Sequence, residues 1–192
     1  MSGAVDRTSV AFVRRRDRAV EDDAWVRAFL HRAPLGFLAT VGEGGQPFLN
    51  SNLFVFDEPR HVIFMHTARL SRTRQNVEQR ERVCFSATEM GRLLPASTAL
   101  DFSVEYASVV VFGRGSLVLD EADAIPALQM LLDKYAPHLE AGRDYRPPIS
   151  EEVRRTSVYR IDIEEWSGKR KAVAEDFPGA FVYGQAGISR SP

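Results

Sequence analysis

Residues 66–73 combine side-chain and backbone groups that could hold a phosphate. Residues 62–65 are apolar and favour a strand, and the polar residues after them read as a short helix with Ser71 as its N-cap. A strand that leads straight into a helix leaves unpaired backbone N–H groups at one point, where an anion is favoured. The same segment also supplies hydroxyl groups and a guanidinium: Thr67, Ser71, Thr73 and Arg72. The sequence therefore predicts a phosphate cradle between this strand and this helix.

Two polar groups beside this cradle could take part in chemistry. His66 ends the strand, and an unperturbed imidazole titrates at about 6.5, so it could donate a proton near neutral pH. Alternatively, His66 is a partly buried residue bonded to a neighbouring strand. Residues 50–52 (Asn-Ser-Asn) interrupt an otherwise apolar strand. They are either exposed or hydrogen-bonded to a ligand ring.

Composition bounds the function. The chain has 192 residues and a net charge of −1, which suits one globular domain and argues against nucleic-acid binding by the whole surface. The single cysteine, Cys84, lies in an apolar run and is expected to be buried, and no His/Asp/Glu set has metal-ligand spacing. No apolar run reaches transmembrane length, so we expect a cytoplasmic protein without a membrane partner. We divide the chain into an N-terminal arm (1–20), one domain (21–170) and a C-terminal tail (171–192).

The elements that position these groups are mainly strands. The sequence predicts an antiparallel meander of three strands, a fourth strand, an irregular segment over 88–102, and two later strands, listed by range: 35–41, 47–56, 61–67, 83–87, 103–119 and 157–163. Gly113 and Gly115 predict either a bulge or a sharp bend in the strand 103–119. Helices are expected after Asp22 or Asp23, after Ser71 and after Asp120. We therefore expect a mainly β fold with peripheral helices, a six-stranded antiparallel barrel. Because several strands are apolar on both faces, we expect a homodimer packed through the sheet surface.

The pattern resembles the FMN-binding split-barrel superfamily typified by pyridoxamine phosphate oxidase, and within it the nitroimidazole-resistance (Nim) type. The stretches that carry the resemblance span roughly residues 30–172: Gly36-Phe37-Leu38-Ala39-Thr40, His66-Thr67, residues 106–113 (Tyr-Ala-Ser-Val-Val-Val-Phe-Gly), Arg155-Thr156-Ser157-Val158-Tyr159 and Trp166-Ser167-Gly168-Lys169. The resemblance implies a split-barrel homodimer with FMN at the subunit interface.

The oxidase branch holds the flavin phosphate with a Thr-Asn-x-x-Ser-Arg-Lys segment, and residues 67–73 occupy its place. Thr67, Ser71 and Arg72 match this motif, whereas Ala68 replaces the asparagine and Thr73 replaces the lysine. The missing lysine removes one cation from the site of a dianionic phosphate. Nim-type proteins also have a histidine at the position of His66, and the resemblance implies that it acts in the reduction of a nitro group.

Other residues would then complete the flavin site. The ring would lie against the strand that carries Asn50, Ser51 and Asn52. Tyr106 or Trp166 of the partner subunit could cover the ring, although Trp166 could instead anchor the dimer interface. Lys169 could supply a charge near the phosphate or the ring, or be an exposed residue.

These inferences predict an FMN-dependent oxidoreductase that reduces small nitroaromatic or quinone-like electron acceptors. A split barrel that binds deazaflavin or haem is one alternative. A flavin-storing or flavin-sensing dimer without enzymatic activity is another. A pyridoxamine phosphate oxidase activity is disfavoured, because residues 166–192 do not match the substrate-binding C-terminal segment of that enzyme.

Overall fold

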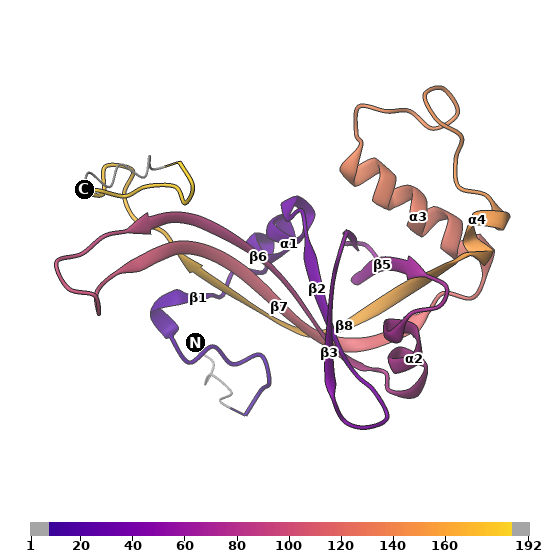
Figure 1. Cartoon of the computed structure of the whole chain (residues 1–192), viewed down its shortest axis with the longest axis horizontal. Helices are drawn as coiled ribbons and strands as arrows, with labels where there is room; N and C mark the ends of the chain where they lie inside the picture. The colour runs from indigo at the N-terminus through magenta and orange to yellow at the C-terminus, as the bar shows by residue number, and fades with distance from the viewer. Residues whose placement is uncertain (1–7, 186–192) are drawn as a thin grey trace, which may run out of the picture.

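The structure, a computed structural model, describes residues 8–185. It has one antiparallel sheet with helices around it (Figure 1). The strands are β1 Ala19–Val20, β2 Gly36–Val41, β3 Pro47–Asn52, β4 Phe54–Asp57, β5 Val62–Ala68, β6 Arg82–Leu94, β7 Ser103–Leu117 and β8 Thr156–Lys171. The helices are the 3-10 turn η1 Arg16–Arg18 and the α-helices α1 Asp23–Arg32, α2 Arg72–Gln79, α3 Glu121–Tyr135 and α4 Ser150–Arg154.

The sheet closes into a barrel through a single chain segment. The strand order is β3-β2-β6-β7-β8-β5-β4, so β3 and β4 lie at its two ends. Leu53 alone separates these two strands in the chain. The predicted strand 47–56 is therefore broken at Leu53, and its halves pair with different neighbours, β2 and β5. This corrects the simple meander and makes the two edges of the sheet adjacent, as in a split barrel.

The predicted strands are present, but two are longer than the sequence indicated. β6 continues through 88–94, which was predicted to be irregular, and β8 continues to Lys171. Both extensions are held by pairing with β7, and Arg92 bonds Glu105 bidentately at 2.8 and 3.0 Å. In Figure 1 β6 and β7 extend away from the barrel toward the C-terminal segment, whereas α3 and α4 lie at the other end. Residues 88–94 therefore form a strand because they pair with a distant segment, although their own sequence favours a strand only weakly.

The N-terminal segment is less independent than the predicted arm 1–20. The end of this segment lies alongside β8, where Ala19 pairs with Lys169 and Val20 pairs with Gly168. This segment carries a cluster of arginines that is largely exposed, Arg14, Arg15, Arg16 and Arg18, and they make local ion pairs, including Arg15–Asp17 at 2.7 Å. Residues 1–7 of the predicted arm and 186–192 of the predicted tail lie outside the described residues.

The local signals at chain turns are confirmed. Asp22, Ser71 and Asp120 each cap a helix by accepting a backbone N–H bond. The register of β7 and β8 shifts between Phe112 and Gly113, which is the predicted bulge. A Cβ at Gly113 would lie 2.1 Å from the Asp162 carbonyl oxygen, so only glycine fits the close approach of the two strands.

The buried residues form two clusters on the two sides of β5 and β8. Ile63, Met65, Tyr159 and Ile161 face the barrel interior, where they meet α1 and α2. The alternate residues of the same strands pack against α3 and α4, including Val62, Phe64 and Val158. Because successive strand residues point to opposite faces, this alternation decides which groups of the candidate site share a side.

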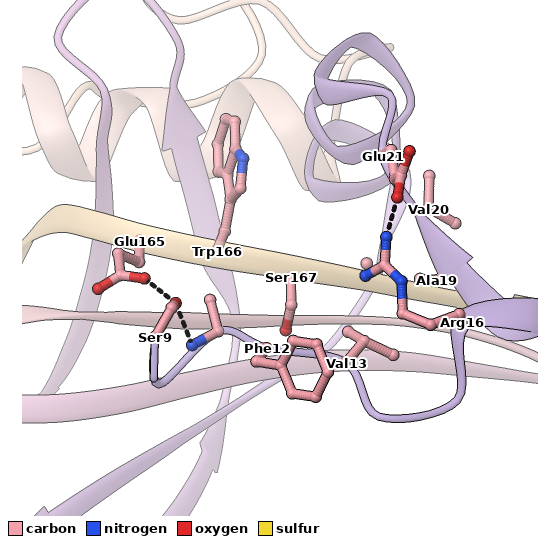
Figure 2. A pocket seen from close by; sticks show the side chains of 12 residues that line it. Ser9, Phe12, Val13, Arg16, Ala19, Val20, Glu21, Glu165, Trp166 and Ser167 are labelled. Atoms are coloured by element: carbon pink, nitrogen blue, oxygen red, sulfur yellow. Dashed lines mark hydrogen bonds and ion pairs between the residues drawn. The ribbon is translucent and has the colours of Figure 1, made fainter. Parts of the chain in front are cut away.

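The outer face of the sheet, opposite the barrel interior, is apolar and half-exposed. We call it the outer sheet face. The strand register places on it the side chains of Phe37, Ala39, Cys84, Ser86, Val110, Phe112 and Ser167. Figure 2 shows Phe12 and Val13 on the Ser167 side of β8, and Trp166 on the opposite side. The N-terminal segment therefore lies over the β8 margin of the outer sheet face and lines an open pocket of about 390 Å³ there.

Candidate functional site

The strand-to-helix corner has the geometry that the sequence predicts. β5 ends at Ala68 and α2 begins at Arg72. The Ser71 Oγ accepts the Arg74 N–H at 3.1 Å, and the Ser71 carbonyl accepts the N–H of Gln75. Within residues 8–185 the N–H groups of Arg72 and Thr73 have no acceptor. Two donors at the positive end of the helix are thus free for an anion.

Three hydroxyl groups meet directly behind this corner. The Thr67 Oγ1 lies 2.7 Å from the Tyr159 hydroxyl and 3.0 Å from the Ser71 Oγ, and Ser71 lies 3.1 Å from Tyr159. Tyr159 is 1% exposed and its ring belongs to the barrel core. Tyr159 was not among the predicted site residues. Its position on the predicted strand 157–163 was the available signal, but which residues it meets depends on the pairing of β8 with β5.

Arginines without a carboxylate partner surround the corner. Most arginines of residues 8–185 lie within 4 Å of an Asp or Glu oxygen; among those that do not, Arg69, Arg72 and Arg155 belong to the segments that meet at the corner. The Arg69 backbone N–H donates to the Arg155 carbonyl at 3.1 Å, and the Arg69 guanidinium donates to the Arg154 carbonyl at 3.2 Å. The Arg72 guanidinium lies 5.3 Å from the centroid of the Phe48 ring on β3. Backbone pairing thus brings the segments that carry Arg69 and Arg155 together beside the corner. Of these arginines, only Arg72 was predicted as a site residue.

His66 and Thr67 are adjacent in β5 but face opposite sides. Thr67 points toward Tyr159, whereas His66 lies on the face of β5 that packs under α3, with Val158 as its cross-strand neighbour. His66 is half-buried, and this burial lowers the pKa of the imidazole. Its ring has no hydrogen-bond partner in the described part of the chain, so the expectation of a histidine bonded to a neighbouring strand holds only for its backbone oxygen, which accepts a bond from Asn52.

The edge of β5 is open beside His66. Pairing with β4 ends at Met65, and β5 continues for three residues beyond it. A ligand could therefore contact His66 and the Ser71 corner together only by lying along this edge. The turn that follows is uncovered, because Ala68 and Arg69 are exposed and Leu70 is 93% exposed.

Comparison with known proteins places the fold in a family. The model of the protein family described as "Pyridoxamine 5'-phosphate oxidase" matches residues 22–170. The chain belongs to the pyridoxamine 5'-phosphate oxidase family. Its fold is the split barrel of the FMN-binding superfamily, as predicted. No curated protein matches the chain significantly.

Solved structures share this family fold over most of the chain. The flavocytochrome Anf3 from Azotobacter vinelandii is 26% identical with a TM-score of 0.75, covering 88% of this chain and 75% of that one. A FAD- and haem-binding protein from Mycobacterium smegmatis is 21% identical with a TM-score of 0.71, covering 81% and 74%. A Bacteroides thetaiotaomicron protein whose proposed role is 5-nitroimidazole antibiotic resistance is 16% identical with a TM-score of 0.66, covering 79% and 86%. At these identities the last two show the fold alone.

The departure from the oxidase phosphate motif has a structural counterpart. Thr73, which stands where the oxidase branch has lysine, is 2% exposed, and the Asn50 side-chain amide donates to its Oγ1 at 3.3 Å. The Thr73 hydroxyl is therefore turned toward β3 and away from solvent. Thr73 can offer an anion its backbone N–H, and the missing lysine charge has to come from the surrounding arginines.

The three polar residues of β3 do not act as one group. Asn50 and Asn52 share the barrel-facing side of the strand, where they bond Thr73 Oγ1 and the His66 carbonyl oxygen. Ser51 pairs with Phe37 and is exposed on the outer sheet face. Because successive strand residues point to opposite faces, a ligand ring on one face of β3 could meet the side chains of Asn50 and Asn52 or that of Ser51, but not all three.

The remaining predicted residues lie at the other end of β8. Trp166 donates from Nε1 to the Asp23 carboxylate at 2.8 Å and packs against His61, with ring centroids 4.7 Å apart. The Lys169 ammonium lies 5.9 Å from the centroid of the Tyr106 ring. Lys169 is twelve residues along β8 from Ser157, the cross-strand neighbour of Thr67, a strand length of roughly 40 Å. In one chain these residues cannot share a site with the corner.

Three further predictions concerned metal ligands, Cys84 and membrane-spanning segments. Across residues 8–185, no group of three His, Cys, Asp or Glu side chains could hold a metal ion. Cys84 is half-buried on the outer sheet face, and burial raises the pKa of its thiol. No helix of the described chain is long and apolar enough to cross a membrane.

Proposed function

We propose that the chain is a flavin-dependent oxidoreductase that binds the flavin phosphate at the corner between β5 and α2. The family and its split-barrel fold support flavin binding. The observation that carries the location is the pair of free backbone N–H groups at the start of α2, in segments that also carry three arginines without carboxylate partners, Arg69, Arg72 and Arg155. Such a donor set suits a phosphate, because charge-assisted bonds to anions are roughly twice as strong as neutral ones.

Within this site the residues have separate tasks. Arg72, the N–H groups of the first turn of α2 and the Ser71 hydroxyl hold the phosphate. Arg69 and Arg155 supply the charge that the oxidase branch takes from its lysine. The bound flavin would supply the transfer of electrons to the substrate. FMN is our first choice of flavin, because the donors gather around one compact point; FAD or a deazaflavin would extend beyond it.

His66 is the proton donor in this proposal. Its imidazole is half-buried, has no partner among the described residues, and lies at the open edge of β5. A protonated Nδ1 or Nε2 could donate to an oxygen or nitrogen of an acceptor as that atom gains electrons. Small nitroaromatic and quinone-like compounds are acceptors of this kind. Their planar rings would also suit the apolar surroundings of a sheet surface.

The site needs a second surface, and we propose that another copy of the chain supplies it. The corner is open in one subunit, as the exposure of Leu70 indicates. The outer sheet face is apolar and half-exposed, and Leu49 on it is 61% exposed. A homodimer packed through this face would cover it and could bring Tyr106, Trp166 or Lys169 of one subunit toward the corner of the other.

Haem binding is the second candidate. The similar protein from Azotobacter vinelandii is a flavocytochrome, and the one from Mycobacterium smegmatis binds both FAD and haem. In this chain the feature that favours haem is the unpartnered, half-buried His66, since a neutral imidazole is a common axial ligand. Its lowered pKa keeps the imidazole neutral and able to coordinate iron at neutral pH.

Titration of the purified protein with FMN, FAD, a deazaflavin and haemin tests both candidates. Quenching of flavin fluorescence at micromolar FMN or FAD, followed by turnover of a nitroaromatic or quinone acceptor, supports the proposed function. A Soret band that is lost in His66→Ala supports the haem candidate. Flavin binding without turnover of any acceptor would support a storage or sensing role, and absence of flavin binding would remove the proposal.

A further inference from the structure

The hydroxyl group of Tyr159 is held in a fixed position behind the corner. The phenol ring is fully enclosed by the barrel core, and its oxygen touches both Thr67 and Ser71 at 2.7 and 3.1 Å. Thr67 and Ser71 are themselves 3.0 Å apart, so the three oxygens form a closed triangle. Only Ser71 of the three residues belongs to the N-terminal end of α2 and stands at the mouth of the phosphate cradle.

The triangle contains three protons, and their acceptors can be counted. Each hydroxyl group donates once and can accept twice. The Thr67 hydroxyl can donate to the Ala68 carbonyl at 3.0 Å, and Tyr159 then donates to Thr67 across the shortest edge. The Ser71 oxygen already accepts the Arg74 N–H. With Thr67 donating to Ala68 and Tyr159 donating to Thr67, the proton of Ser71 is free to turn outward.

We propose that Tyr159 is a positioning residue for the phosphate site, which directs the Ser71 hydroxyl proton toward a bound phosphate. This inference rests on the proposed function and deepens it. When the Tyr159 hydroxyl is present, it satisfies Thr67, and Ser71 is free to donate to the anion. When it is removed, the Thr67 oxygen lacks a donor, and Ser71 turns inward to it across 3.0 Å. The phosphate then loses one charge-assisted bond.

The test compares FMN with riboflavin, which has the same ring and no phosphate. In Tyr159→Phe the aromatic ring remains, so we expect FMN affinity to fall roughly tenfold while riboflavin affinity changes by less than about twofold. The matched control is Tyr135→Phe, which removes another hydroxyl that is bonded to backbone oxygens, those of Pro34 and Phe54. The control should keep the parental ratio of FMN to riboflavin affinity.

FMN binding by the parent protein tests the proposed function, and the comparison with Tyr159→Phe tests the role of Tyr159. If the parent protein does not bind FMN, the proposed function fails. If the parent binds FMN and Tyr159→Phe keeps the parental ratio, the positioning role is overturned and the proposed function stands.

A second variant applies should Tyr159→Phe not fold. Ser71→Gly removes the hydroxyl that Tyr159 is proposed to direct, and glycine is well tolerated at an N-cap in place of serine. We expect the ratio of FMN to riboflavin affinity to fall roughly tenfold in this variant, as in Tyr159→Phe. An unchanged preference in Ser71→Gly would overturn the role of Tyr159 without any use of the phenylalanine variant.

Discussion

The side-chain amide of Asn50 donates to Thr73 Oγ1 at 3.3 Å and thereby joins β3 to the first turn of α2. This contact fixes Thr73 in a site that is 2% exposed. It explains why a lysine cannot simply be restored at this position. In this chain the residue is part of the barrel packing, and the positive charge of the corner comes from arginines on either side of it.

Thr73→Lys tests this packing. A lysine side chain would overfill a buried site and lose the Asn50 bond, so we expect the free energy of unfolding to fall by about 1–3 kcal/mol. FMN affinity should not rise. Chemical denaturation and FMN titration measure the two effects. The control is Gln75→Lys, at an exposed position of the same helix, which should leave stability within about 0.5 kcal/mol. Tighter FMN binding with parental stability in Thr73→Lys would contradict the assigned role of Thr73.

Arg72→Ala should weaken FMN binding by roughly tenfold to hundredfold, because one charge-assisted phosphate bond contributes about 1.5–3 kcal/mol. Riboflavin affinity should change little. Arg80→Ala is the matched control, since Arg80 is also without a carboxylate partner in the described chain, but lies at the C-terminal end of α2. Equal losses in the two variants would mean that general positive charge, and not the corner, attracts the flavin.

His66→Gln should abolish acceptor reduction while FMN affinity stays within about twofold. Because burial lowers the pKa of His66 below about 6.5, the imidazolium form becomes populated only on the acid side of that value. We therefore expect the rate of acceptor reduction to rise as pH falls through the pKa of His66, and His66→Gln to lack this rise. A rate that is independent of pH across the acid and neutral range in the parent would argue against His66 as the proton donor.

The same shift affects stability with a definite sign. The folded protein holds the imidazole neutral, whereas the unfolded chain protonates it near its ordinary value of about 6.5. Stability should therefore decrease as pH falls from that value toward the lower pKa of the folded state. Denaturation curves of the parent and His66→Gln across this window measure the contribution, which the variant should lack.

Val110→Arg should convert the proposed homodimer into a folded monomer. Val110 is half-exposed at the centre of the outer sheet face, between Ser86 and Ser167 on the neighbouring strands, and an arginine pair there could not be buried without partners. Sedimentation measures the mass, and circular dichroism the fold. Leu132→Arg, an exposed position on α3, is the control and should remain dimeric. A monomeric parent would refute the interface.

Cys84 provides an independent probe of the same interface. It is the only cysteine of the chain and lies on the outer sheet face, beside Ala39 and Phe112. Its reaction with a thiol reagent should be slow in the dimer and faster in Val110→Arg. Equal rates in both proteins would place the subunit contact elsewhere.

Gly113→Ala should destabilise the fold by about 2–4 kcal/mol, because the new Cβ would meet the Asp162 carbonyl oxygen at 2.1 Å and force the two longest strands apart. Gly44→Ala is the control, since nothing lies within 4 Å of the added methyl group. Thermal unfolding of both variants measures the difference. A parental melting temperature for Gly113→Ala would mean that the bulge adapts without cost.

The amino-acid sequence by itself determined the local features of this protein. Each helix cap that was predicted, at Asp22, Ser71 and Asp120, depends on a bond to a backbone group two or three residues away. The bulge at Gly113 follows from a residue type that permits close approach. The corner between β5 and α2 was predictable for the same reason, because its strand, turn and helix are consecutive in the chain.

The tertiary structure alone decided which distant groups share the site. Tyr159 reaches Ser71 across 88 residues of chain, and Arg155 reaches Arg69 through pairing of β5 with β8. The break at Leu53 sends β3 and β4 to opposite ends of the sheet, which turns Asn50 inward and Ser51 outward. These contacts depend on strand register, because a shift of one residue would move every side chain of a strand to the opposite face of the sheet. Register is set by the packing of the whole barrel, so no local stretch of sequence contains it.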